Sequence, residues 1–73
     1  MNEFILIAEK YLDGQSTLKD LESWLAPRLA NYLTDLNSYC GNLATIIELS
    51  LAEFSDEIIS EDIIKTRLIH FFS

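Results

Sequence analysis

Residues that commonly perform chemistry are scarce in this 73-residue chain. It has one cysteine, one histidine, one proline and two glycines, and it contains five basic and twelve acidic residues. A lone cysteine excludes an intrachain disulfide and is typical of a reducing, cytoplasmic setting. Two isolated glycines exclude the glycine-rich loops that cradle phosphates. No apolar run approaches the roughly 20 residues of a membrane span. The start Met1-Asn2-Glu3 lacks the basic residues of a signal peptide, so we expect a cytoplasmic protein without a membrane segment.

Candidate catalytic and metal-binding residues are equally few. A thiolate catalyst would need Cys40 and His70 together with an orienting group. The simpler interpretation is a buried, apolar Cys40 and a His70 whose positive form is favoured near a helix C-terminus. A structural zinc site needs about four ligands, mostly cysteine or histidine, and one cysteine and one histidine cannot supply them. Placing Gly14 at the sixth position of a calcium-binding loop puts Tyr11 where a carboxylate is required, and Asp20 where the longer glutamate is usual. We therefore predict no enzyme, no metal and no cofactor.

The charge is strongly one-sided. The formal net charge is −7 at pH 7, and five of the ten residues from Glu53 to Asp62 are acidic while none is basic. Phosphate backbones and anionic lipids repel such a chain, so direct nucleic-acid or membrane binding is disfavoured. A basic surface on another protein would attract it. The alternative is that these acids are solvated helix faces that serve solubility.

Helical periodicity of apolar residues runs through the first half of the chain. Gly14 suits the left-handed residue that closes a first helix, and Thr17 with Asp20 forms an N-terminal capping pair for a second. Pro27 lacks an N–H and clashes with the preceding turn of a helix. The second helix therefore either kinks there or gives way to a new one with Pro27 in its first turn, and we expect it to end near Asn37. The stripe of the first helix is Phe4, Ile7, Ala8, Tyr11 and Leu12.

The second half repeats this plan. Residues 37–42, which include Gly41, are predicted to form a loop before the third main helix. Ser60 is predicted to cap the last helix, with Ile59 and Ile64 as the apolar pair on either side of its start. The stripe of the third main helix is Leu43, Ile46, Ile47, Leu51 and Phe54.

An offset of 43 residues relates the two halves. The matching pairs are Tyr11/Phe54, Asp13/Asp56, Thr17/Ser60, Leu21/Ile64 and Leu25/Leu68. The pattern predicts one all-α domain over residues 1–73, an antiparallel bundle of four or five helices built from two helical hairpins. The predicted core is Phe4, Ile7, Tyr11, Leu21, Trp24, Leu25, Leu29, Leu33, Ile47, Leu51, Phe54, Ile64, Leu68 and Phe72.

Residues 47–58 resemble the second helix and following turn of an acyl carrier protein. In that family an Asp-Ser-Leu at the start of the helix bears the phosphopantetheine arm. Residues 38–43 read Ser-Tyr-Cys-Gly-Asn-Leu instead. The resemblance therefore lacks the residue that holds the prosthetic group and implies only a degenerate carrier.

A second resemblance covers more of the chain. Residues 6–22 are similar to the opening of small bacterial immunity proteins of the colicin D type, in which an apolar helix and a short turn precede a Ser/Thr-capped helix. Residues 55–65, followed by Leu68, are similar to the last helix of these proteins. The resemblance implies a helical antidote that covers the basic cleft of a tRNA-cutting toxin, with acidic side chains in place of RNA phosphates.

These observations predict a non-enzymatic protein-binding module that covers a basic site on a partner such as a toxin or nuclease. The alternative is a structural protein whose excess apolar surface pairs two copies of the chain as a homodimer. Ile58, Ile69 and Phe71, which lie off the core stripe, would then form the contact. For the binding module, the predicted contact residues are Glu53, Asp56, Glu57, Glu61 and Asp62, with Asp13 and Asp20 on the other turn.

Overall fold

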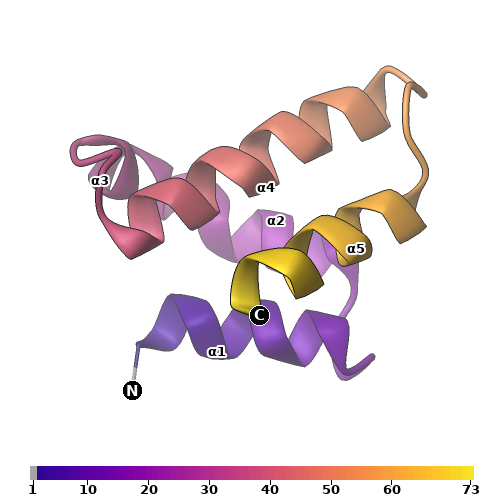
Figure 1. Ribbon diagram of the computed structural model, residues 1–73, viewed down its shortest axis with the longest axis horizontal. Coiled ribbons are helices and arrows are strands. Elements are labelled where there is room, and N and C mark those ends of the chain that lie inside the picture. The colour runs from indigo at the N-terminus through magenta and orange to yellow at the C-terminus, as the bar shows by residue number, and fades with distance from the viewer. Residues whose placement is uncertain (1) are drawn as a thin grey trace.

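The computed structural model describes residues 2–73, and these form an all-α bundle of two antiparallel hairpins (Figure 1). One hairpin pairs α1 with α2, and the other pairs α4 with α5. Helix α1 also packs against α5, and α3 against α4, which joins the hairpins. The predicted all-α bundle is confirmed. The elements in chain order are α1 (Glu3–Leu12), α2 (Leu18–Leu25), a 3-10 turn (Ala26–Arg28), α3 (Leu29–Leu33), α4 (Tyr39–Ser55) and α5 (Glu61–Phe72).

The first hairpin follows its local sequence signals. The side chain of Asn2 accepts hydrogen bonds from the backbone N–H groups of Phe4 and Ile5 in the first turn of α1. Gly14 has a φ of 81°, the left-handed conformation predicted for it. The Thr17 hydroxyl accepts from the Asp20 N–H and the Asp20 carboxylate accepts from the Thr17 N–H, both at 3.1 Å. This reciprocal pair satisfies two N–H groups that would otherwise lack partners at the start of α2.

Pro27 breaks the second helix. It lies in the first turn of the 3-10 segment, where its missing N–H leaves no hydrogen bond unmade. Arg28 covers the break, because its guanidinium donates to the Trp24 carbonyl at 2.6 Å and lies over the Trp24 ring at 4.5 Å. The helical stretch then ends at Leu33, so the predicted end near Asn37 is wrong.

The predicted loop over residues 37–42 is also wrong from residue 39 onward. Helix α4 begins at Tyr39, and the Ser38 side chain caps it by accepting from the Gly41 N–H at 2.9 Å. Gly41 is a buried helical residue. A Cβ at this position would collide with the Asp35 backbone, so the glycine permits a close approach rather than ending a helix.

The core lies between the two hairpins and differs in part from the predicted one. Leu33 and Phe54 are exposed, by 40% and 39%, because each lies in the last turn of its helix. Five predicted core residues are only partly buried: Ile7, Trp24, Leu29, Leu51 and Phe72. The buried residues that the prediction missed are Ala8, Leu18, Leu43 and Ala44. The predicted residues that are buried are Phe4, Tyr11, Leu21, Leu25, Ile47, Ile64 and Leu68.

The turn of the second hairpin repeats the backbone of the first. In the first turn, the N–H groups of Gly14 and Gln15 donate to the carbonyls of Tyr11 and Lys10. In the second turn, the N–H groups of Glu57 and Ile58, each 43 positions later, donate to the carbonyls of Phe54 and Glu53. Both are Schellman motifs, so the repeat extends to the hydrogen bonds. Ser60 occupies the N-cap position of α5, but its side chain makes no capping hydrogen bond, which corrects the predicted cap.

No helix within residues 2–73 combines the length and the apolar character that crossing a membrane would require.

A candidate protein-binding surface at the α4–α5 hairpin

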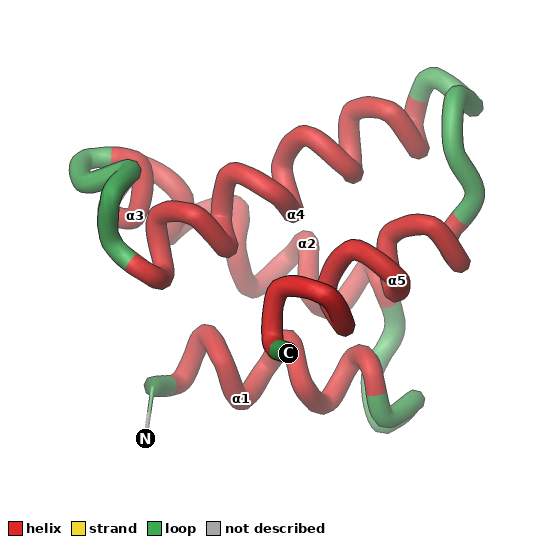
Figure 2. The backbone as a smooth tube through the Cα atoms, in the orientation of Figure 1, coloured by secondary structure: helices red, strands yellow, loops and turns green. Residues whose placement is uncertain are grey.

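The two acidic turns lie at the same end of the molecule, on the right of Figures 1 and 2. A hydrogen bond joins the hairpins there, because the Tyr11 hydroxyl donates to the Glu61 carboxylate at 2.7 Å. Burial of Tyr11, together with this bond, raises the pKa of its phenol well above the ordinary value. All seven predicted contact residues belong to the turns or to the helix turns next to them.

Three of the seven already serve the fold. Glu53 is half-buried and forms an ion pair with Arg67 at 2.6 Å, the one ion pair within residues 2–73. Glu61 accepts the hydrogen bond from Tyr11, and Asp20 belongs to the cap of α2. The Asp20–Thr17 contact is the capping pair predicted from the sequence, whereas the contacts of Glu53 with Arg67 and of Glu61 with Tyr11 could not be inferred from the acidic pattern.

The other four, Asp13, Asp56, Glu57 and Asp62, are exposed. Asp56 caps the C-terminus of α4, where the helix dipole disfavours a negative charge. Glu57 has a φ of 61°, the one positive φ among the described residues other than glycine. A side chain in this conformation costs about 1 kcal/mol, and glycine would avoid that cost. Asp56 and Glu57 are therefore at positions where they reduce stability, whereas Asp62 lies in the first turn of α5, where the helix dipole favours it.

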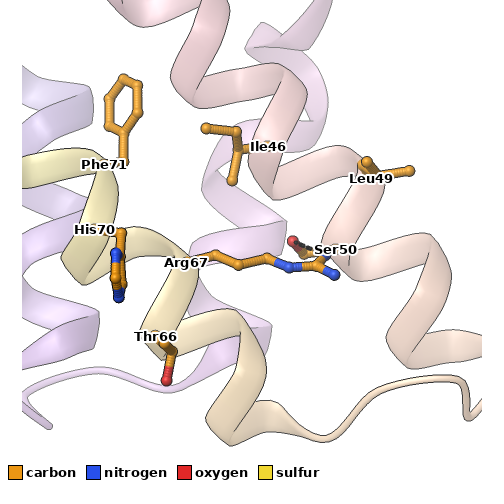
Figure 3. Close-up of a pocket in the computed structure, with 7 residues that line it drawn as sticks. All are labelled: Ile46, Leu49, Ser50, Thr66, Arg67, His70 and Phe71. Atoms are coloured by element: carbon orange, nitrogen blue, oxygen red, sulfur yellow. Dashed lines mark hydrogen bonds between the residues drawn. The ribbon is translucent and has the colours of Figure 1, made fainter.

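A groove runs between α4 and α5, beginning about one helical turn away from this turn. Ile46 and Leu49 line it from α4, and Phe71 from α5 (Figure 3). Its volume is about 470 Å³, and its lining is mainly apolar. Leu49 is 60% exposed, whereas Phe71 is half-buried and packs on Tyr39 with ring centroids 4.8 Å apart. The other residues that line the groove are Ser50, Thr66, Arg67 and His70.

Arg67 lies across the groove toward α4 (Figure 3). One of its terminal nitrogens, Nη1, donates to Ser50 Oγ at 3.1 Å and to the Glu53 carboxylate at 2.6 Å. Ser50 is the buried polar side chain of α4, so the guanidinium satisfies its hydroxyl. Sequence reasoning missed the groove. The signal for it was the helical spacing of Ile46, Leu49, Ser50 and Glu53, which places them on one face of α4.

Apolar side chains are also exposed in the α4–α5 turn and farther along α5. Ile58, within the turn, is 67% exposed, and Ile69 on α5 is 55% exposed. These two belong to the set predicted for self-association. Phe71, the third member of that set, is half-buried and lines the groove.

Cys40 and His70 lie in different surroundings. Cys40 Sγ accepts a hydrogen bond from Asn2 Nδ2 at 3.1 Å, while His70 lines the α4–α5 groove. Among the described residues, no hydrogen bond joins the two. Residues 2–73 contain no group of three or more His, Cys, Asp or Glu side chains arranged to hold a metal ion.

Comparison with protein-family models, curated proteins and solved structures found no match to this chain. The similarity to colicin D-type immunity proteins stays a prediction from the residue pattern.

Proposed function

We propose that this protein is a non-enzymatic binding module that uses the α4–α5 turn to cover a basic site on a partner protein. The contact surface consists of Asp56, Glu57 and Asp62, with Asp13 on the neighbouring turn. Glu53, Glu61 and Asp20 contribute their charge to the same end of the molecule while holding the fold together.

The observation that carries the proposal is the placement of charge at the α4–α5 turn. Asp56 opposes the dipole of α4, and Glu57 occupies a left-handed position that glycine would fill at lower cost. Solubility alone does not require carboxylates at these two sites, because acids elsewhere on the helices serve it equally well. Carboxylates that reduce stability are instead expected where binding requires them.

The class of partner follows from charge and from the immunity-protein resemblance. A net charge of −7 speeds encounter with a cationic surface and repels nucleic acid. The basic cleft of a nuclease toxin has this chemistry, because it is built to hold phosphates. We propose that the carboxylates of the turn occupy such a cleft.

The test compares two triple variants with the same net charge. The first is Asp56→Asn/Glu57→Gln/Asp62→Asn. The second, the control, is Glu9→Gln/Glu22→Gln/Glu48→Gln, which neutralises three exposed acids outside the turn. Each protein is immobilised and used to capture partners from the source cell, and the Kd for the captured protein is then measured at increasing salt.

The wild type and the control should retain a basic protein whose affinity falls steeply with salt, because screening weakens exposed charge pairs. The turn variant should bind it at least about tenfold more weakly. Equal weakening in both triple variants would contradict the proposal, because it would mean that overall charge matters and the turn does not.

Self-association is the second candidate function, and the exposure of Ile58 and Ile69 favours it. An apolar dimer should increase in mass with protein concentration and depend little on salt. Sedimentation equilibrium of the wild type and of Ile58→Gln/Ile69→Gln distinguishes the two functions. A monomer at all concentrations would exclude a structural role of this kind.

A further inference from the structure

We propose that the α4–α5 groove receives an apolar side chain from a cationic helix of the partner, whose basic residues contact the acidic turn. This inference rests on the proposed function. It adds an apolar contact in the groove, and it specifies how apolar and basic residues are arranged on the partner. The groove supplies the apolar contact, and the turn supplies the charge.

The groove has the size and the lining for such an anchor. Its volume of about 470 Å³ lies in the range of pockets that enclose small ligands, and Ile46, Leu49 and Phe71 provide apolar contact. Leu49 is largely exposed in the free protein, so an apolar side chain placed against it removes water from both surfaces.

The charge around the groove disfavours an anionic occupant. Arg67 lines the groove, but its Nη1 is paired with Glu53 at 2.6 Å and donates a second hydrogen bond to Ser50. A carboxylate or phosphate would compete with Glu53 and would be repelled by the net charge of the chain. A second copy of the protein brings the same net charge of −7 toward the groove and is disfavoured for the same reason.

The order of side chains along α4 determines which order of apolar and basic residues in a partner helix is complementary to it. Ile46, Leu49 and Glu53 follow one another on the same face, and Asp56 and Glu57 come directly after the end of the helix. A segment lying along this face therefore meets apolar surface first and carboxylates one to two turns later. A partner helix with a leucine, and with lysine or arginine one to two turns away, is complementary to that order.

Two synthetic peptides test this pattern. Both are short, amidated helical peptides with the same lysines. One carries two leucines on a single face, and the other carries alanines in their place. Each is titrated into the full protein while backbone amide shifts are followed by NMR, with sodium dodecanoate as an anionic amphiphile for comparison.

The leucine peptide should shift the amides of residues 46–50 and 66–71 together with those of the turn. It should bind at least about tenfold more tightly than the alanine peptide, because burial of one leucine contributes more than a tenfold change in Kd. Leu49→Gln should remove this difference. The matched control Leu6→Gln, an exposed leucine of α1 outside the groove, should leave it unchanged.

Other outcomes separate the groove from the turn. Equal binding of both peptides, with shifts confined to residues 53–62, would overturn the groove contact while leaving the acidic function intact. Binding of neither peptide would overturn both proposals. Tighter binding of dodecanoate than of the leucine peptide would overturn the cationic occupant, and so would a dimer that protects the groove amides without any peptide.

Discussion

The turns of the two hairpins share one backbone design and differ in the side chains placed on it. Both close their first helix with a Schellman motif, and both begin the next helix at a Thr or Ser in the N-cap position. The α1–α2 turn has Gly14 at the left-handed position and a complete capping box at Thr17. The α4–α5 turn has Glu57 and an unbonded Ser60 at the equivalent positions.

The two turns therefore differ in how well their residues suit the backbone and in the charged groups that they expose. In the α1–α2 turn, Gly14 and Thr17 suit the left-handed and N-cap positions, although Asp13 opposes the dipole of α1 as Asp56 opposes that of α4. In the α4–α5 turn, Glu57 strains the left-handed position and Ser60 makes no capping bond, and the turn that contains Ile58 also exposes the carboxylates of Asp56 and Glu57. The α4–α5 turn is therefore where we place the binding surface, and the α1–α2 turn serves as its internal reference.

The largest effects are expected where the two hairpins are alike, at the buried pair Leu21 and Ile64. Each residue lies four positions after its N-cap, and both are buried in the shared core. Leu21→Ala and Ile64→Ala should each lower the free energy of unfolding by about 2–5 kcal/mol. Urea denaturation checks this. A loss under about 1 kcal/mol in only one variant would show that the hairpins do not share a core equally.

Tyr11 and its repeat partner Phe54 sharpen the comparison, because Tyr11 is buried and Phe54 is exposed. Tyr11→Phe removes the hydrogen bond to Glu61 and should cost about 1.5 kcal/mol. Because the folded state raises the pKa of Tyr11, its contribution is complete below about pH 10 and is lost as the pH rises further. Stability measured between pH 8 and about pH 11.5 should therefore fall more steeply in the wild type than in Tyr11→Phe. Tyr39→Phe, a change on an exposed ring, should retain the wild-type slope.

The left-handed positions should respond with opposite signs. A Cβ at Gly14 meets no atom within 4 Å, so the cost of Gly14→Ala is one of backbone conformation, about 1 kcal/mol. Glu57→Gly relieves the same strain and should stabilise the protein by about 0.5–1 kcal/mol. Glu57→Gln is the control for charge, and it should stabilise by less because it keeps the strained side chain. Thermal unfolding of the three variants provides the measurement, and a destabilised Glu57→Gly would contradict the strain.

The capping residues should show the smallest difference. Thr17→Ala loses the bond to the Asp20 N–H and should destabilise by about 1 kcal/mol. Ser60→Ala removes no capping bond and should stay within about 0.5 kcal/mol of the wild type. Chemical denaturation of both variants in parallel is sufficient. Equal losses would mean that Ser60 caps α5 in solution.

The sequence predicted the first hairpin and the repeat because their signals are local. A left-handed glycine, a capping pair and a helical stripe each depend on residues within about four positions of one another. The same reasoning failed at Gly41, which resembles a loop residue until the backbone of Asp35 is seen to pack against it. It also failed at Phe54, which continues the stripe of its helix but extends beyond the core.

For the candidate site, the acidic pattern led us to predict contacts at the turn, but it did not indicate which of its side chains make contacts within the fold. Glu53, Glu61 and Asp20 have the same charge as their neighbours. The contact of Asp20 with Thr17 followed from a local signal, but those of Glu53 with Arg67 and of Glu61 with Tyr11 depend on packing between distant helices. The α4–α5 groove likewise needs two helices at a particular separation, and no single stretch of sequence contains that information.

Composition and local order therefore account for the all-α class, the hairpin turns and the anionic character of this protein, since each arises from neighbouring residues or from their sum. Packing between distant segments decided which carboxylates are free and where an apolar groove opens beside them. Tyr11 and Glu61 are 50 residues apart in the chain, and their hydrogen bond exists only because α1 and α5 are brought together. Interactions of that kind depend on the arrangement of whole helices, which side-chain periodicity constrains only weakly.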